Sequence, residues 1–154
     1  MKHKNLITIA LALLASAPTF SFAKEKAKEP VDYVNPYIGN ISHLLVPTFP
    51  TIQLPNSMLR AYPVRADYTS ELLDGLPVLV TNHRERSAFR LSVTQGEELR
   101  PVIPMTYDNE HLTPYSFDVD VADGAAWVRF AVAEHSAAYR IHFNQSGPVT
   151  VLLT

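Results

Sequence analysis

The sequence contains no cysteine, so disulfide bonds, cysteine-based metal sites and thiol catalysis are all excluded. Stability must therefore come from a packed hydrophobic core, and a chain of 154 residues is long enough to build one. Lysine is absent after Lys28, and the body from Val31 onward carries eight arginines against thirteen acidic residues, a net charge of about −5. Such a body offers no basic patch, so we expect no nucleic-acid partner and no association with anionic membranes.

Long helical periods are also absent. Twelve prolines and five glycines are spread over short segments, and proline interrupts helix interiors. Only residues 70–75 fit a helical turn, which Gly75 would close. Elsewhere short apolar or alternating runs lie between turn signals, a pattern that predicts an all-β antiparallel sandwich with few or no helices.

The clearest strands lie at the end of the chain. Residues 115–121 alternate apolar and polar side chains, the two-residue period of a half-buried strand. Asp123 and Gly124 then supply a hairpin signal, because glycine readily takes a positive φ. Further strands are predicted over residues 126–133, 139–144 and 149–154. Because the chain stops inside an apolar strand, we expect it to be part of a longer protein.

Weaker signals precede these strands. Prolines at positions 47, 50 and 55 restrict residues 41–55 to short or edge strands. Residues 108–114 are predicted to form a polar loop. The other strand candidates are residues 57–62, 76–81, 88–94 and 99–107.

The chain begins like a secretory leader. A basic start at residues 2–4 precedes an apolar run, Leu6 to Ala17, that is too short to span a bilayer comfortably. Ser21 to Ala23 matches a small-x-small cleavage site, so the sequence predicts a signal peptide over residues 1–23, with an uncleaved anchor as the alternative. Residues 24–30 are predicted to be a charged linker. No cysteine follows the cleavage site, so we expect a periplasmic or secreted protein without a lipid anchor.

Three short motifs then occur in a characteristic order. The opening is Val31-Asp-Tyr-Val-Asn-Pro-Tyr-Ile-Gly39, followed by Thr48-Phe49-Pro50 and by Leu54-Pro-Asn-Ser-Met58. With the later strand pair, at residues 114–121 and 139–143, the set resembles the N-terminal β-sandwich domain of glycoside hydrolase family 92, the exo-acting α-mannosidases. The resemblance covers residues 31–154. It departs from the family at residues 40–45, where a Gly/His-rich loop is reduced, and at Asn56-Ser57, where a Phe-Gly pair is replaced.

The resemblance implies a supersandwich-like domain that packs on a larger (α/α)6 catalytic barrel. In the family the barrel carries the general acid and base and much of a calcium site, and members invert configuration at the anomeric carbon. The barrel lies outside these 154 residues. No catalytic residue and no metal ligand is therefore assigned to this chain, and calcium is expected only in a complete family enzyme.

Candidate binding residues lie mainly in loops. Asn82, His83 and Arg84 follow a predicted buried strand, and loops at strand ends commonly display binding residues. They would contact sugar hydroxyls or the missing barrel, or would simply form a charged turn. His43 lies among apolar residues and is either a packing residue or a ligand contact. Trp127, the only tryptophan, is predicted to lie outside the core, where it would stack on a sugar or fill a domain interface.

The carboxylates suggest ordinary surface roles. Asp118 and Asp120 share the polar face of one strand and fit a solvated sheet surface better than a catalytic pair. Asp108, Glu110 and His111 offer too few oxygens for calcium, which takes six to eight. The sequence thus leaves three hypotheses: an accessory domain of a family 92 enzyme, a free-standing lectin-like sandwich that binds mannose-containing glycans, or a structural remnant.

Overall fold

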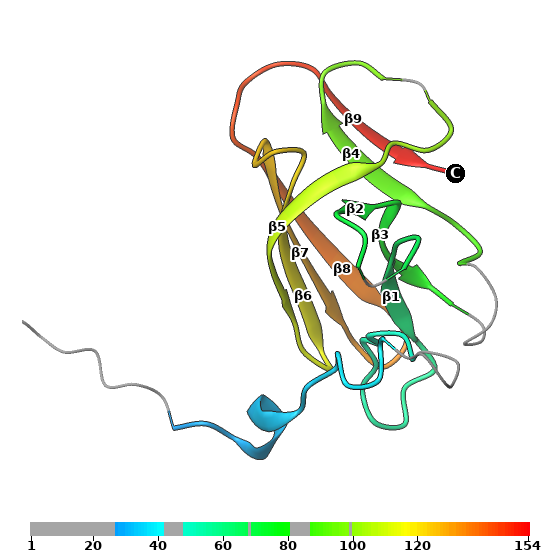
Figure 1. Ribbon diagram of the computed structural model, residues 1–154, viewed down its shortest axis with the longest axis vertical. Coiled ribbons are helices and arrows are strands. Elements are labelled where there is room, and N and C mark those ends of the chain that lie inside the picture. The colour runs from blue at the N-terminus through cyan, green and yellow to red at the C-terminus, as the bar shows by residue number, and fades with distance from the viewer. Residues whose placement is uncertain (1–26, 42–47, 68, 81–86, 99) are drawn as a thin grey trace, which may run out of the picture.

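Two antiparallel sheets form the part of the chain that the computed structural model describes, residues 27–41, 48–67, 69–80, 87–98 and 100–154 (Figure 1). The predicted all-β sandwich is therefore confirmed. The first sheet has the strand order β1-β3-β4-β9 and the second β2-β5-β6-β7-β8. The first comprises β1 (Ala61–Val64), β3 (Gly75–Leu79), β4 (Leu91–Gln95) and β9 (Val149–Leu153). The second comprises β2 (Leu72–Leu73), β5 (Met105–Leu112), β6 (Ser116–Val121), β7 (Ala126–Val132) and β8 (Ala137–Phe143).

The described residues form one short helix, the 3-10 element η1 (Pro30–Tyr33). Pro30 stands in its first turn, where the missing N–H costs nothing. Glu29 and Asp32 form a reciprocal capping box, in which the side chain of each accepts a hydrogen bond from the backbone N–H of the other. No helix in the described ranges is long and apolar enough to cross a membrane.

The core lies between the two sheets and follows the alternation of β6 and β7. Phe117, Val119, Val128 and Phe130 are almost completely buried, while the residues between them face outward. The two strands join through a turn in which Ala122, Asp123 and Gly124 all have positive φ. The predicted hairpin therefore forms, and the buried row joins core residues of the first sheet such as Leu76 and Val93.

Several local predictions were wrong. Strand β1 begins only at Ala61 and β5 only at Met105, later than the candidate strands 57–62 and 99–107 predict. Residues 108–114 do not form a loop, because β5 continues to Leu112 through a bulge: its register with β6 shifts between Asp108 and His111, and Asn109 has a φ of 51°. The extra residue breaks the two-residue alternation, so the segment looked like a polar loop. Residues 70–75 form no helical turn. Leu73 instead pairs with Met105 as part of β2 and is fully buried.

Candidate functional site

A pocket of about 300 Å³ lies beside the segment that follows η1. One wall comes from residues of the opening motif and its continuation: Tyr37, Gly39, Asn40 and Ile41. The rest of the lining comes from Arg65, which follows β1, and from Tyr107 and Glu110 of β5. The pocket thus joins the motif that carries the family resemblance to two strands of different sheets.

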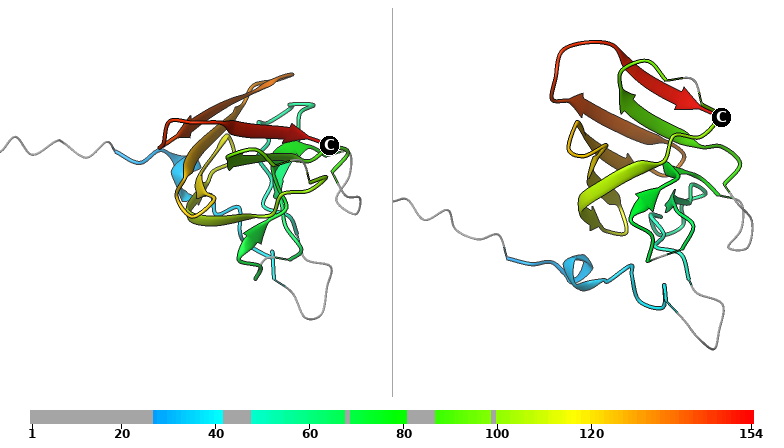
Figure 2. Two further views of the ribbon diagram at one scale, coloured as in Figure 1. Left: turned by 90° about the horizontal axis from the view of Figure 1, so that it is seen from above. Right: turned by 45° about the horizontal axis from the view of Figure 1, so that its top comes forward.

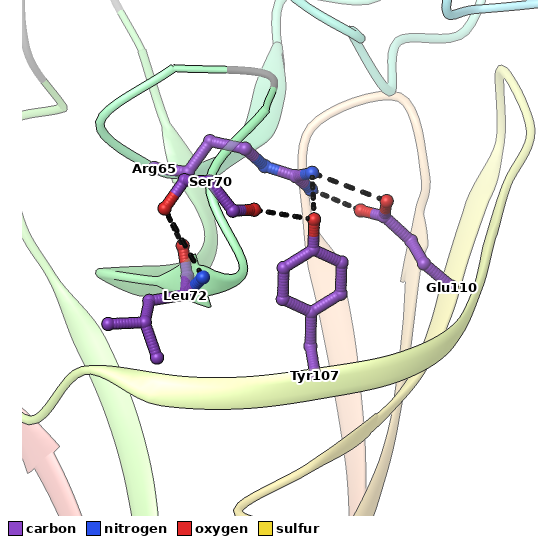
Figure 3. Close-up of polar contacts among 5 residues, drawn as sticks. All are labelled: Arg65, Ser70, Leu72, Tyr107 and Glu110. Atoms are coloured by element: carbon purple, nitrogen blue, oxygen red, sulfur yellow. Dashed lines mark hydrogen bonds and ion pairs between the residues drawn. The ribbon is translucent and has the colours of Figure 1, made fainter.

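A buried ion pair forms the floor of this pocket (Figure 3). The side chains of Arg65 and Glu110 are only 4% and 12% exposed, and two guanidinium nitrogens point at the two carboxylate oxygens. Arg65 also donates to the Tyr107 hydroxyl at 3.1 Å and lies over its ring, 4.9 Å from the centroid. The Tyr107 hydroxyl in turn donates to the carbonyl of Ser70 at 2.8 Å. The opposite charges leave the floor electrically neutral.

Tyr37 brings a phenol to the carboxylate of this pair. Its pKa is raised, first because burial disfavours the phenolate and then because Glu110 carries a negative charge beside it; the charge of Arg65 opposes the shift. A hydrogen bond with Glu110 adds to the rise in pKa. The Tyr37 hydroxyl is therefore protonated at neutral pH and can donate a hydrogen bond.

Asn40 contributes an amide donor that the described part of the chain leaves unused. The residue is only 4% exposed, and its Oδ1 lies 3.2 Å from Thr48 Oγ1. Its Nδ2 is buried and has no hydrogen-bond partner among the described residues. A buried donor without a partner costs about 1–3 kcal/mol. A hydroxyl or carbonyl oxygen of a bound molecule would remove that cost.

Gly39 permits this arrangement of the pocket wall. Its φ is +81°, which disfavours other residues, and a Cβ there would lie only 3.1 Å from Thr48 Oγ1. The Gly39 carbonyl accepts a hydrogen bond from the Thr48 amide at 2.9 Å. Gly39 therefore lets the chain reverse and places Asn40 at the pocket.

Apolar side chains remain in solvent along the same segment. Tyr33, Val34, Ile38 and Ile41 are between 52% and 74% exposed. A contiguous stretch of exposed apolar residues marks an interaction surface more often than scattered single residues do. The segment thus carries both part of a pocket wall and uncovered apolar side chains.

Trp127 lies away from this pocket, on the outer face of the second sheet. Its cross-strand neighbours are Asp120 of β6 and His142 of β8, and the residue is half-buried. The Arg129 guanidinium carbon lies 5.0 Å from the centre of its ring and also pairs with Asp118. The predicted outward position is confirmed, but the ring is already in contact with Arg129.

The other predicted site residues, His43, Asn82, His83 and Arg84, lie outside the described residues. The sequence patterns predicted no binding role for Arg65, Tyr107 or Asn40, and they indicated Glu110 only as a weak metal ligand. The one sequence feature that could have indicated a pocket residue is the position of Asn40, directly after the glycine that ends the opening motif.

A second hollow, of about 430 Å³, lies at the turn between β6 and β7 and includes Asp108, Asp120 and Asp123. All three carboxylates already accept hydrogen bonds at 2.8 Å: Asp108 from the Asn109 backbone N–H, Asp120 from Asn109 Nδ2 and Asp123 from Thr106 Oγ1. Within the described ranges no three histidine or acidic side chains are placed to hold a metal ion.

Comparison with known proteins supports the motif-based resemblance. A search of curated proteins finds no match, and a search of solved structures finds none either. The family model described as the glycosyl hydrolase family 92 N-terminal domain matches residues 33–154. That range includes all nine strands of the two sheets and the pocket. The chain therefore belongs to the glycosyl hydrolase family 92 N-terminal domain family.

Proposed function

We propose that this chain is the accessory domain of a secreted family 92 glycoside hydrolase and that its pocket supplies part of the rim of a sugar-binding site. The observation that carries the proposal is the buried, unpartnered Nδ2 of Asn40 at the pocket wall. A sugar hydroxyl would accept its hydrogen bond. The neutral Arg65–Glu110 floor and the protonated Tyr37 hydroxyl suit an uncharged, hydroxyl-rich ligand better than an ionic one.

The domain supplies binding groups and no turnover of its own. Inverting glycoside hydrolysis needs two carboxyl groups on opposite sides of the scissile bond, with space for a water molecule. Among the described residues that line the pocket, Glu110 is the one carboxylate, and it is paired with Arg65. The acid and base would come from a separate catalytic domain. The exposed apolar side chains of residues 33–41 would pack against it.

The leader-like start of the chain supports export. If residues 1–23 are removed as a signal peptide, the domain acts in the periplasm or outside the cell, where glycans are available. Calcium, if the complete enzyme uses it, would be held by the catalytic domain.

A free-standing lectin-like sandwich is the second candidate function. The observation that favours it is Trp127, which stands on the open outer face between Asp120 and His142. Indole rings in such positions stack on sugars, but here Arg129 lies against the ring and would have to move.

One NMR titration tests both candidates. The chain from Lys24 to Thr154 is labelled with ¹⁵N and titrated with methyl α-mannoside through the millimolar range. We expect the side-chain amide signals of Asn40 to shift while the Trp127 indole signal does not. Shifts at Trp127 alone would favour the lectin-like function, and no shift at either residue would contradict both.

A matched pair of variants sharpens the result. Asn40→Ala removes the unpartnered amide and should abolish the mannoside-dependent shifts of neighbouring pocket residues. Gln145→Ala removes an amide that lies exposed in the turn before β9 and should leave them unchanged. Equal loss in both variants would show that the shifts do not report the pocket.

A further inference from the structure

The Thr48-Phe49-Pro50 motif lies beside the pocket without being part of its described lining. Two of its three residues are anchored in the body of the sandwich. Pro50 is fully buried, and the Phe49 ring stacks on Tyr62 of β1, with ring centres 4.5 Å apart and planes 7° from parallel. Thr48 is therefore held in a fixed place relative to β1.

Thr48 in turn contacts three consecutive residues of the opening segment. Its backbone N–H donates to the Gly39 carbonyl at 2.9 Å. Its hydroxyl oxygen lies 3.0 Å from the Ile38 carbonyl and 3.2 Å from Asn40 Oδ1. The two segments thus lie beside each other, and Thr48 joins the anchored motif to the wall of the pocket (Figure 2).

The Thr48 hydroxyl determines which end of the Asn40 amide is left free. A hydroxyl has one hydrogen to donate, and the Ile38 carbonyl and Asn40 Oδ1 are both acceptors that share it. No other group in the described part of the chain donates to Oδ1. Because the oxygen and nitrogen lie on opposite sides of the planar amide, binding Oδ1 at Thr48 turns Nδ2 away from Thr48. Nδ2 is the buried donor that has no partner among the described residues.

We propose that Thr48 is a positioning residue, whose hydroxyl holds the Asn40 amide with Nδ2 available to a ligand. The inference rests on the proposed sugar-binding role of the pocket and extends it to the Thr-Phe-Pro motif. Strand β1 then supports both sides of the site. Arg65 of the floor directly follows β1, and Tyr62 within β1 carries Phe49 and so Thr48.

A measurement without ligand tests the positioning itself. Thr48→Val keeps the backbone N–H and the shape of the side chain and removes only the hydroxyl. Thr48 is exposed, so valine there disturbs no core packing. In the ¹⁵N-labelled protein, relaxation of the Asn40 side-chain amide should show more motion in Thr48→Val than in the parent. Thr48→Ser keeps the hydroxyl and should restore the parent value. Equal motion in the parent and Thr48→Val would overturn the proposal.

Titration with methyl α-mannoside then connects positioning to binding. Thr48→Val should weaken binding by about fivefold, the effect of one neutral hydrogen bond, whereas Thr48→Ser should bind like the parent. Thr51→Val is the matched control, because its hydroxyl belongs to the same segment but donates to the Phe49 carbonyl, at 3.0 Å, and not to the Asn40 amide. It should leave the affinity unchanged.

The two measurements separate this inference from the proposed function. A parent that does not bind the mannoside, with an Asn40 amide that still loosens in Thr48→Val, would refute the sugar pocket and support the positioning role. A parent that binds, with an affinity that Thr48→Val leaves unchanged or that Thr51→Val lowers equally, would overturn the positioning role and leave the sugar pocket standing.

Discussion

Strands β6 and β7 bury an unbroken apolar row and keep their charged side chains outside, whereas the pocket end of the molecule does the opposite. At the hairpin, Phe117 and Phe130 are buried and the Arg129–Asp118 pair is partly exposed. At the pocket, the Arg65–Glu110 pair is buried while Ile38 is 74% exposed. The two regions belong to one sandwich and share the strand β5, which pairs with β6.

The buried apolar row of β6 and β7 stabilises the fold, whereas the polar groups of the pocket contribute little to stability. Apolar burial stabilises the fold in proportion to the area removed from water. A buried ion pair adds little net stability, because desolvation of both charges offsets their attraction, and a buried amide without a partner is destabilising. The pocket end therefore has features that the fold alone does not require. A ligand at Asn40 and a partner domain over the exposed apolar segment would account for them.

The largest loss of unfolding free energy is expected from a substitution in the buried core of the β6–β7 hairpin. Phe117→Ala should lower the free energy of unfolding by about 3–5 kcal/mol, because it removes a fully buried aromatic ring and leaves a cavity. A loss of this size is a large fraction of the stability of a small domain. Urea denaturation followed by circular dichroism measures it.

The matched change at the other region is Ile38→Ala. Because this side chain is mostly in solvent, its truncation should change the free energy of unfolding by less than about 0.5 kcal/mol. Equal losses in the two variants would show that the motif segment is part of the core and that its apolar residues are not available to a partner.

The next prediction compares how much the two ion pairs contribute to the free energy of unfolding. Glu110→Gln should cost about 3 kcal/mol, because it leaves the charge of the buried Arg65 side chain without its counter-ion. Asp118→Asn removes the partner of Arg129, whose side chain is 54% exposed, and should cost about 1 kcal/mol or less. Urea denaturation at low and high salt checks this: the Asp118 effect should shrink with salt and the Glu110 effect should persist. A salt-sensitive Glu110 effect would contradict the burial of that pair.

The same contrast explains what the sequence could predict. Alternation is a local pattern, so β6 and β7 were predicted nearly to the residue, and so were the hairpin at Asp123-Gly124 and the strand β9. Core burial of the apolar row followed directly from the period. The bulge at Asn109 concealed the second half of β5, because it removes the alternation on which the prediction depends.

The pocket depends on contacts that no local pattern records. Arg65 and Glu110 are 45 positions apart in the chain, and the tertiary fold brings them together: Arg65 follows β1 of the first sheet and Glu110 lies in β5 of the second. Each taken alone looked like an ordinary polar residue. The family motif at residues 31–39 indicated the right region, but the unpartnered amide of Asn40 becomes visible only from its burial and its neighbours.

The smallest expected effect is a change in the pKa of individual tyrosines. Titration of these tyrosines compares the pocket with β8. Burial raises the pKa of Tyr139, on β8, to about 12, and its hydroxyl donates to the carbonyl of Pro77. Burial also raises the pKa of Tyr37, but there the Glu110 carboxylate adds to the rise. Both phenols should therefore ionise later than ordinary tyrosines, whose pKa is about 10, when tyrosinate absorbance is followed with rising pH. Tyr37→Phe and Tyr139→Phe should each remove one late-ionising group.

Glu110→Gln should separate the two phenols. Loss of the carboxylate charge should lower the pKa of Tyr37 and leave that of Tyr139 unchanged, because burial is the cause of the Tyr139 shift. The effect on stability has a definite sign. A folded-state pKa above the unfolded value gives stabilisation that is complete below about pH 10 and is lost as the pH rises toward 12. Tyr139→Phe should therefore weaken the alkaline loss of stability. If Glu110→Gln shifted both phenols equally, the carboxylate would not act locally at Tyr37, and the pocket would lose its distinct electrostatic character.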